Sequence, residues 1–306
     1  MIFRYTQKNL TWIDLERPTH EEVKQVITEW NIHPIVGQEL IGPTLRPKVE
    51  IYPNFIYLIL HFPVTERKRN GRPVAQREID FIIGKNFIIT TRYDSVDSLH
   101  HFAKLFEVNS ILDRNDIGEH AGFVFYYMIR EIYDSLLHEM EYINDSIRTI
   151  EGNIFKGKER AMVMRISEVS RDLLGAKRSM RLHKEILESF DIAARKFFGE
   201  EFSYYSKAII GEYYKVHNAL ESDMDSISEL RQTNNSLLDT RENEIMKRIT
   251  IIAFLTLPAS VITNFFQMST SSTPIVGQPN DWLILMTIMF GLTVFLFVVA
   301  KSRRWF

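Results

Sequence analysis

Residues 249–268 read ITIIAFLTLPASVITNFFQM, a run of twenty positions without a charged side chain. As an α-helix rising about 1.5 Å per residue, this run would extend roughly 30 Å, the thickness of the hydrocarbon core of a bilayer. A second charge-free run, WLILMTIMFGLTVFLFVVA, occupies residues 282–300, and thirteen residues separate the two runs. The sequence therefore predicts a membrane hairpin that follows a long polar chain.

Small polar side chains gather on one side of the first predicted span. Thr250, Ser260, Asn264 and Gln267 fall within about 100° of one another when each residue advances by about 100°. The stripe follows two interleaved series with seven-residue spacing, 243-250-257-264 and 246-253-260-267, which is typical of helices that pack against copies of themselves. In a bundle of identical helices, a neutral polar stripe can line a wet path through the bilayer. The alternative is a helix–helix contact in which the same side chains form hydrogen bonds.

Cations flank the two predicted spans on one side only. Lys247 and Arg248 precede the first span, and three more cations follow the second within residues 301–306. The connection between the spans, residues 269–281, contains neither Lys nor Arg. The positive-inside rule then predicts a multi-pass protein of the cell (inner) membrane with both termini in the cytoplasm. The first residues, MIFRYTQKNLTW, lack the apolar core of a cleaved signal peptide.

Composition and motif content exclude several classes of protein. A net charge of −2 gives no general attraction to nucleic acid, so no nucleic-acid partner is expected. The chain has no cysteine, which rules out disulfides and thiolate metal sites. It also lacks glycine-rich phosphate-binding loops and the His-Glu-x-x-His and Gly-x-Ser-x-Gly motifs. We therefore expect neither an enzyme nor an organic cofactor.

Residues 1–115 alternate strand-like and helix-like patterns, which predicts an α/β domain. Strand patterns occur at WIDLE, KVEIY, FIYLILHFPV, EIDFII and FIITTRY, and Thr19 with Glu22 three residues later predicts a capped helix start. The basic run 67–72 contains Asn70-Gly71, a hairpin-turn signal, and predicts a solvated turn rather than a phosphate site.

Helical spacing dominates from about residue 94. We predict helices over residues 94–107, 118–155 and 158–190. A further helix begins near residue 202 and meets no proline before Pro258, so it would run into the membrane without a break. At about 1.5 Å per residue its length is on the order of 100 Å, which predicts a stalk in an oligomer rather than a globular helix.

Acidic residues recur along this predicted stalk. Near the cytoplasmic mouth of an oligomeric pore, they would concentrate cations or coordinate a hard divalent ion through oxygen. Glu221, Asp223 and Asp225 are the candidates for such a regulatory metal site. The alternative is a solvated helix face with ion pairs between successive turns.

Several segments together resemble the CorA-type divalent-cation (magnesium) transporter family. They are WIDLE, RPKVEIYPNFIYLILHFPV, EIDFIIGKNFIITTRY, IEGNIFKGKERAMV and, most specifically, ENEIMKRITIIAFLTLP. The resemblance covers nearly the whole chain. It implies a funnel-shaped homopentamer whose cytoplasmic α+β domain, an α/β sheet layer plus long helices, leads to a two-helix transmembrane hairpin. It also implies divalent cations, membrane lipid and further copies of the chain as partners.

The resemblance implies roles for particular residues. The pore-facing positions are Asn243, Met246, Ile249, Leu257, Ser260 and Asn264. Rings of Met246 and Leu257 would form a hydrophobic gate, with Asn243 at its cytoplasmic end. Magnesium is implied both as the transported ion and as a regulatory ion bound between neighbouring stalks. One stalk position that is usually acidic in the family is Gln232 here.

The chain departs from the family pattern at the predicted outer mouth. The hallmark there is Gly-Met-Asn, whose Asn oxygens hold a hydrated cation, whereas this chain has Gln267, Met268 and Ser269. Neutral oxygens remain available, and Mg²⁺ would meet them through its water shell because it gives up its inner waters reluctantly. The shorter Ser side chain predicts looser selectivity for Mg²⁺.

These observations predict seven consecutive segments. They are a cytoplasmic α/β domain (1–115), long cytoplasmic helices (116–200), a stalk helix (201–248), a pore-lining span (249–268), an extracellular loop (269–281), a second span (282–300) and a basic cytoplasmic tail (301–306). The function expected is passive transport of divalent cations, principally Mg²⁺, with Co²⁺, Ni²⁺ and Zn²⁺ as further candidates. The alternatives are a divergent zinc-type, weakly selective or non-conducting relative, and a membrane-anchored scaffold.

Overall fold

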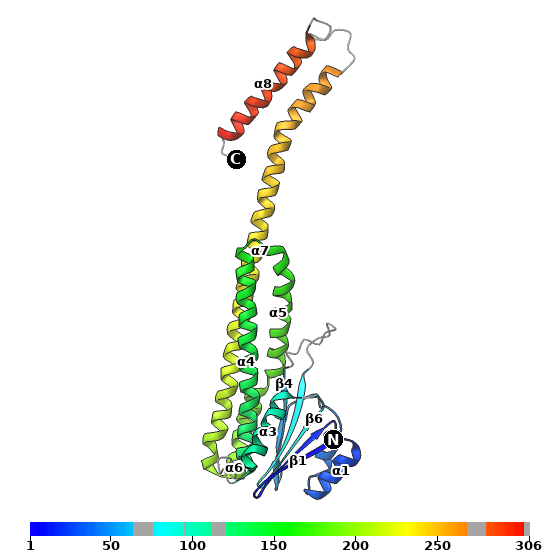
Figure 1. Ribbon diagram of the computed structural model, residues 1–306, viewed down its shortest axis with the longest axis vertical. Helices are drawn as coiled ribbons and strands as arrows, with labels where there is room; N and C mark the ends of the chain where they lie inside the picture. The colour runs from blue at the N-terminus through cyan, green and yellow to red at the C-terminus, as the bar shows by residue number, and fades with distance from the viewer. Residues whose placement is uncertain (64–75, 95, 112–119, 268–279, 303–306) are drawn as a thin grey trace. The chain divides into compact units, whose positions relative to one another are not determined.

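The computed structural model describes residues 1–63, 76–94, 96–111, 120–267 and 280–302 (Figure 1). The chain divides into two compact units, Met1–Arg231 and Gln232–Phe306. Helix α7, Ser203–Gln267, begins in the first unit and ends in the second, with Pro258 inside it. The prediction of one helix that starts near residue 202 and continues past Pro258 is therefore confirmed.

A six-stranded sheet forms the centre of the first unit. In spatial order its strands are β1 (Ile2–Gln7), β2 (Leu10–Glu16), β6 (Phe87–Arg92), β5 (Arg77–Gly84), β4 (Phe55–Phe62) and β3 (Lys48–Ile51). Strands β2 and β6 run parallel, and the other neighbouring pairs are antiparallel. The five predicted strands are confirmed. Strand β1 was not predicted, because the turn that joins it to β2 contains Lys8 at φ 51° rather than a glycine.

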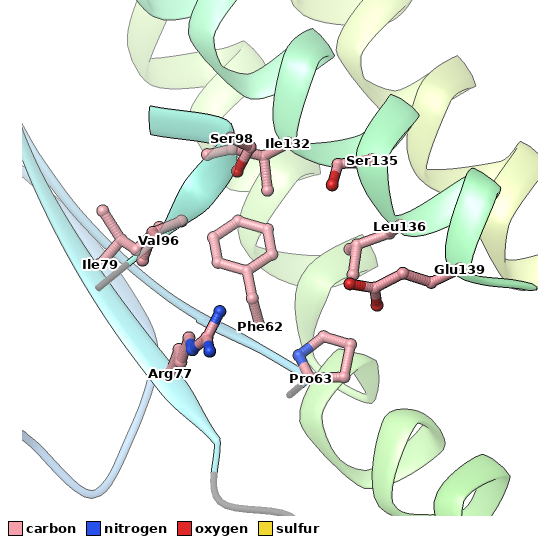
Figure 2. A pocket seen from close by; sticks show the side chains of 10 residues that line it. All are labelled: Phe62, Pro63, Arg77, Ile79, Val96, Ser98, Ile132, Ser135, Leu136 and Glu139. Carbon is pink, nitrogen blue, oxygen red and sulfur yellow. The ribbon is translucent and has the colours of Figure 1, made fainter. Parts of the chain in front are cut away.

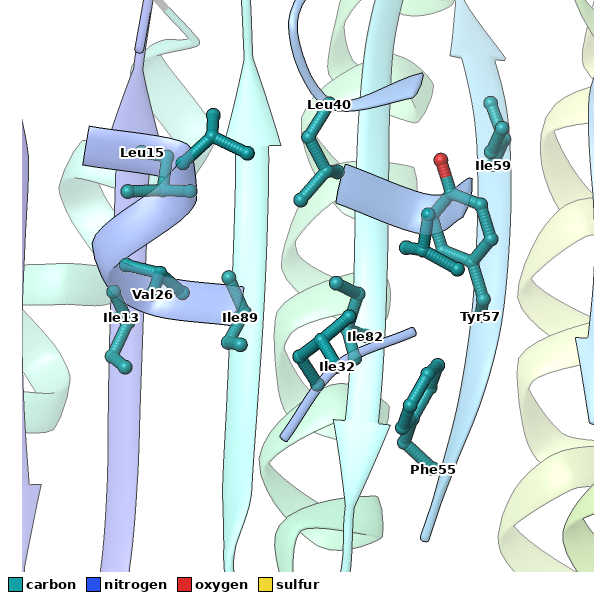
Figure 3. Packing of buried hydrophobic residues seen from close by; sticks show 12 residues of the cluster. Ile13, Leu15, Val26, Ile32, Leu40, Phe55, Tyr57, Ile59, Ile82 and Ile89 are labelled. Carbon is teal, nitrogen blue, oxygen red and sulfur yellow. The ribbon is translucent and has the colours of Figure 1, made fainter. Parts of the chain in front are cut away.

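Helices α1 (His20–Glu29) and α2 (Pro34–Glu39) cover one face of the sheet. Figure 3 shows Val26 and Leu40 packed over strand residues such as Ile13 and Ile82 in one buried cluster. Thr19 caps α1 in the predicted way, because its hydroxyl accepts from the Glu22 amide while the Glu22 carboxylate accepts from the Thr19 amide. The cap starts α1 directly after β2 and so directs it back across the sheet.

Helices α3 (Asp97–Ile111) and α4 (Ala121–Phe155) pack on the other face. The Trp12 and Phe106 rings lie 5.9 Å apart between centroids, and the Phe81 and Phe125 rings lie 5.2 Å apart. The helical residues 159–198 contact β4, and every residue of this strand is buried. A strand buried on both faces reads as a continuous apolar run, which explains why FIYLILHF shows no alternation.

Two helices replace the single helix predicted over residues 158–190, so that prediction was wrong. Helix α5 spans Glu159–Met180 and α6 spans His183–Phe198. Neither proline nor glycine marks the break. At the start of α6, His183 is fully buried, its Nε2 donates to the backbone oxygen of His61 at 2.8 Å, and its Nδ1 accepts from the Tyr133 hydroxyl at 2.8 Å. The break between α5 and α6 therefore coincides with hydrogen bonds from His183 to residues far away in the sequence.

Helices α4, α5 and the first part of α7 run side by side in the first unit (Figure 1). The Asn144 amide on α4 donates to Asp223 on α7 at 2.9 Å. The Arg231 guanidinium on α7 donates to the Ser170 hydroxyl on α5 at 2.5 Å. These contacts attach the start of the predicted stalk firmly to the folded unit.

The second unit contains the rest of α7 and helix α8, Asp281–Ser302. The basic run 67–72 with its predicted turn, most of the predicted loop 269–281 and most of the tail 301–306 lie outside the described residues.

Candidate functional site

Among the described residues, helix α7 becomes exposed on all sides shortly after it enters the second unit. Every residue from 239 to 250 is exposed to solvent in the single chain. These positions include apolar side chains, of which Met246 is 60% and Ile249 54% exposed. A helix that is unsupported on all sides needs partners to be stable. The described part of the chain therefore leaves this stretch of α7 uncovered.

The six predicted pore positions are all exposed in the single chain. Asn243, Met246 and Ile249 lie in the unsupported stretch, and Leu257, Ser260 and Asn264 follow on the same helix. Met246 and Leu257, the two expected gate residues, are exposed to nearly the same degree, 60% and 62%. The helix thus presents a surface of alternating polar and apolar positions that no described part of its own chain covers.

Two hydroxyl groups of the stripe use their protons within the helix, which leaves their oxygens able to accept hydrogen bonds from outside it. Thr250 Oγ1 donates to the Met246 carbonyl oxygen at 2.8 Å, and Ser260 Oγ donates to the Thr256 carbonyl oxygen at 3.1 Å. A hydroxyl has one proton and two lone pairs, so each oxygen is left to accept from outside the helix. The water shell of a cation presents donors outward. The stripe therefore has the polarity that a hydrated cation requires.

Helix α8 contacts α7 away from the stripe. Thr263 Oγ1 lies 3.8 Å from the Met289 sulfur, and Ile251 is one of the few buried residues of this part of α7. At about 100° per residue, both positions fall outside the sector that contains Leu257 and Asn264. The contact with α8 consequently leaves the stripe open.

Two helices of the described residues have the length and composition of membrane spans. The apolar windows fall within Glu200–Asn264, which contains most of α7, and within Trp282–Ser302, with mean hydropathies of 1.7 and 2.7. Only 6% of each window is buried within the chain. Apolar helices exposed to this extent fit contact with lipid or with other chains rather than a soluble core.

The three acidic stalk candidates have different surroundings. Glu221 forms an ion pair with Lys177 at 2.8 Å, Asp223 is buried against Asn144, and Asp225 is exposed. Burial raises the pKa of the Asp223 carboxyl above its usual value, and the Asn144 hydrogen bond partly opposes this shift. No cluster of three His, Cys, Asp or Glu side chains fit to hold a metal occurs among the described residues. Within one chain, the three carboxylates are therefore not brought together.

A family model described as CorA-like Mg²⁺ transporter protein matches residues 7–304. The chain belongs to this family. Among curated proteins, this CorA-like chain is 22% identical over 296 residues to the cobalt/magnesium transport protein CorA of Thermotoga maritima, covering 96% of this chain and 83% of that protein.

Solved structures show the same fold. The complete structure of the CorA magnesium transporter from Methanocaldococcus jannaschii matches the CorA-like chain with a TM-score of 0.83 at 17% identity, covering 97% of this chain and 92% of that one. The structure of the full-length CmaX protein matches with a TM-score of 0.75 at 17% identity, covering 97% and 89%. At these identities the likeness concerns the fold: a soluble α/β domain, long helices and two candidate membrane helices.

The predicted selectivity mouth lies at the limit of what the structure describes in this CorA-like chain. Gln267 is the last residue of α7, and Met268 and Ser269 lie outside the described residues. The roles assigned to these three positions therefore stay predictions.

A cavity of about 130 Å³ lies in the first unit of the CorA-like chain, between the sheet and helices α3 and α4 (Figure 2). The ring of Phe62 lies at its centre in this view, and the side chains of Arg77 and Glu139 border it. Sequence reasoning did not find this cavity, because its lining comes from segments far apart in the chain. Its lining contains one guanidinium and one carboxylate, and no group of three His, Cys, Asp or Glu side chains fit to hold a metal occurs there among the described residues.

Proposed function

We propose that this chain transports divalent cations, principally Mg²⁺, as a passive channel formed by five copies arranged as a funnel. The observation that carries the proposal is the exposed stripe on a charge-free helix of a CorA-like chain, with its hydroxyl oxygens directed to accept. Placed around a common axis, five such helices would enclose a path lined by neutral oxygens. In this proposal the membrane is the cell (inner) membrane, and both termini are cytoplasmic, because Lys and Arg flank the two spans but are absent between them.

In this proposal, polar and apolar rings alternate along the path. Asn243 forms the cytoplasmic end, and Met246, Ile249 and Leu257 form apolar constrictions that stop conduction by excluding water. Ser260 and Asn264 accept hydrogen bonds from the waters of the ion. Mg²⁺ retains those waters readily, so it would pass as a hydrated ion rather than a stripped one.

The outer mouth decides selectivity in this proposal. Gln267, Met268 and Ser269 stand where the family motif Gly-Met-Asn is expected, and a ring of Ser hydroxyls is shorter and wider than a ring of Asn amides. Co²⁺, Ni²⁺ and Zn²⁺ would then pass alongside Mg²⁺. The altered motif also favours the second candidate, a zinc-type, weakly selective or non-conducting relative.

Regulation by cytoplasmic Mg²⁺ is proposed to involve the acidic stalk positions between neighbouring chains. Asp225 is exposed and can reach a neighbour, whereas Glu221 would have to exchange Lys177 for the metal. Asp223 is buried and would have to leave Asn144. A site made by several chains would supply the oxygen ligands that one chain does not assemble.

The test is metal uptake into proteoliposomes driven by a concentration gradient alone. We expect flux of Mg²⁺ that needs neither ATP nor a second ion, and no flux for any of Mg²⁺, Co²⁺, Ni²⁺ and Zn²⁺ would overturn the proposal. The double variant Gln267→Gly/Ser269→Asn separates the two candidates. An increased preference for Mg²⁺ supports a selectivity mouth at these positions, and an unchanged preference refutes that assignment. Absence of flux together with an apolar-sealed helix bundle would favour the membrane-anchored scaffold.

A further inference from the structure

The connection between α4 and α5 presents a basic and apolar surface that the proposed ion pathway does not use. We define the hairpin tip as residues 155–164, FKGKERAMVM. Phe155 is 69% and Met164 64% exposed, and Val163 is exposed as well. Single exposed apolar residues are ordinary on protein surfaces. Here three of them share a short tip with three cations.

The charges of the hairpin tip are all of one sign at the surface. Lys156, Lys158 and Arg160 are exposed. The single carboxylate of the tip, Glu159, is 4% exposed and so contributes little to the surface. A surface with three exposed cations and no exposed anion is complementary to an anionic partner.

The backbone of the hairpin tip is well defined. Gly157 adopts φ 83°, a conformation that favours glycine, and its amide donates to the Ile154 carbonyl oxygen at 3.0 Å. The Lys158 amide donates to the Asn153 carbonyl oxygen at 3.1 Å. Ile154 is buried next to the exposed Phe155. The turn therefore holds Phe155 and the cations outward on a fixed support.

The hairpin tip lies at the end of the first unit from which α7 continues toward its charge-free segment. Lys177 on α5 pairs with Glu221 on α7, and Ser170, nearer the tip, bonds Arg231, the last residue of the unit. Positions closer to the tip thus meet later positions of α7. The opposite end of the unit, where α7 begins, has mixed charges, because Glu200 and Glu201 are exposed there together with Lys196 and Lys207.

From these observations we infer that the hairpin tip binds the anionic headgroup surface of the membrane in which the chain is anchored. Exposed Phe and Met beside Lys and Arg is the composition that peripheral segments use at such surfaces, where apolar groups enter the headgroup boundary and cations attract anionic lipid. The membrane helices already hold the chain at a bilayer, so the tip needs only a weak contact. This binding is separate from the ion that the chain transports.

The test uses the full-length chain, which contains no cysteine. The variant Ala161→Cys places an environment-sensitive fluorophore on the hairpin tip and leaves Phe155 and the three cations intact. The protein is reconstituted in vesicles of phosphatidylcholine alone, or of phosphatidylcholine with phosphatidylglycerol. We expect a blue-shifted emission in the anionic vesicles that is lost at high salt, because salt screens the attraction.

Neutralising two cations, in Lys156→Gln/Lys158→Gln, should weaken the contact roughly thirtyfold, since each cation near an anionic surface is worth about a fivefold change. The matched control Lys24→Gln/Lys104→Gln removes two exposed cations from α1 and α3 and should leave the emission unchanged. A label at Tyr204→Cys, an exposed position at the opposite end of the first unit, should report water in both kinds of vesicle.

Two results would overturn the inference. The first is emission from the tip label that is water-like in both vesicles. The second is emission that is equally blue-shifted in neutral and anionic vesicles and insensitive to salt, which would mean that a neighbouring copy of the chain covers the tip. Neither readout involves metal flux, so failure here is distinguishable from failure of the proposed transport.

Discussion

Removal of the guanidinium of Arg92 should strongly destabilise the first unit. Arg92 is 1% exposed, and its Nη2 donates to Asp14 Oδ2 at 2.9 Å and to Glu16 Oε2 at 3.0 Å. Its Nε approaches the two Asp14 oxygens at 3.4 and 3.1 Å. Asp14 is also buried and accepts from the Thr90 hydroxyl at 2.7 Å. The pair therefore joins β2 to β6, the parallel pair of strands in the sheet.

The magnitude follows from which charges remain. In Arg92→Met the Asp14 carboxylate stays buried without a counter-charge, and breaking a buried pair in this way costs about 3–5 kcal/mol. Glu16 is partly exposed and can be solvated, so it adds little. A typical domain has a free energy of unfolding of about 5–15 kcal/mol, so the variant would retain only part of its stability.

A double-mutant cycle tests the physical reason. In Asp14→Leu/Arg92→Met both charges are gone, and we expect most of the lost stability to return, less about 1 kcal/mol because Thr90 loses its acceptor. The assay is urea-induced unfolding of the first unit in the full-length chain, followed by hydrogen exchange of the β2 and β6 amides. The reasoning is refuted if Arg92→Met costs under about 1 kcal/mol, or if the double variant is no more stable than the single one.

Three further predictions concern pH dependence and conduction. Burial lowers the pKa of His183 to about 4, whereas in the unfolded chain its pKa is near the usual 6.5. Between these two pH values the unfolded chain binds a proton that the folded chain does not, so the free energy of unfolding should rise with pH by roughly 3 kcal/mol. The variant His183→Gln should flatten this pH dependence in urea unfolding. Asp223 should give a pH dependence of the opposite sign, because burial raises the pKa of its carboxyl in the folded chain. As the pH rises above the ordinary pKa of 3.8, the folded chain retains a proton that the unfolded chain has lost, so the free energy of unfolding should fall. The variant Asp223→Asn should remove that loss, and Asp225→Asn is the control at an exposed position. Leu257→Asn should make the proposed apolar constriction wettable and raise passive Mg²⁺ flux about tenfold or more in proteoliposomes. The control Ile252→Asn changes an exposed side chain that points about 140° away from Leu257 on the same helix, and it should raise the flux less; equal effects would refute the assignment of Leu257 to the path.

Local patterns predicted most elements of the first unit. The apolar runs predicted β4 and β5, and Thr19 with Glu22 predicted the start of α1, because each signal lies within a few residues. The break before His183 was missed, because its partners, Tyr133 and the backbone of His61, lie 50 and 122 residues away. Strand β1 was missed because Lys8, rather than a glycine, occupies the turn that joins it to β2.

In the candidate site, likewise, local spacing predicted some features, and features that depend on contacts distant in sequence could not be predicted. The stripe of Asn243, Leu257 and Ser260 follows from seven-residue spacing, and the structure places all three on one exposed helix. The state of the acidic stalk residues did not follow from the sequence. Burial of Asp223 depends on Asn144 of α4, and engagement of Glu221 depends on Lys177 of α5.

The sequence alone predicted two charge-free segments long enough to span a membrane, the first of them on one continuous helix, with Lys and Arg before the first segment and after the second but not between them. These predictions depend on segment length, absence of charge and the positions of Lys and Arg, which are local features of the sequence that determine insertion and orientation in a bilayer. Only the tertiary structure decided that β2 pairs parallel to β6, that Asp223 is buried while Asp225 is exposed, and that the hairpin tip lies at the Arg231 end of the first unit. Each of these depends on contacts between residues tens of positions apart, which close only when the helices and the sheet pack together.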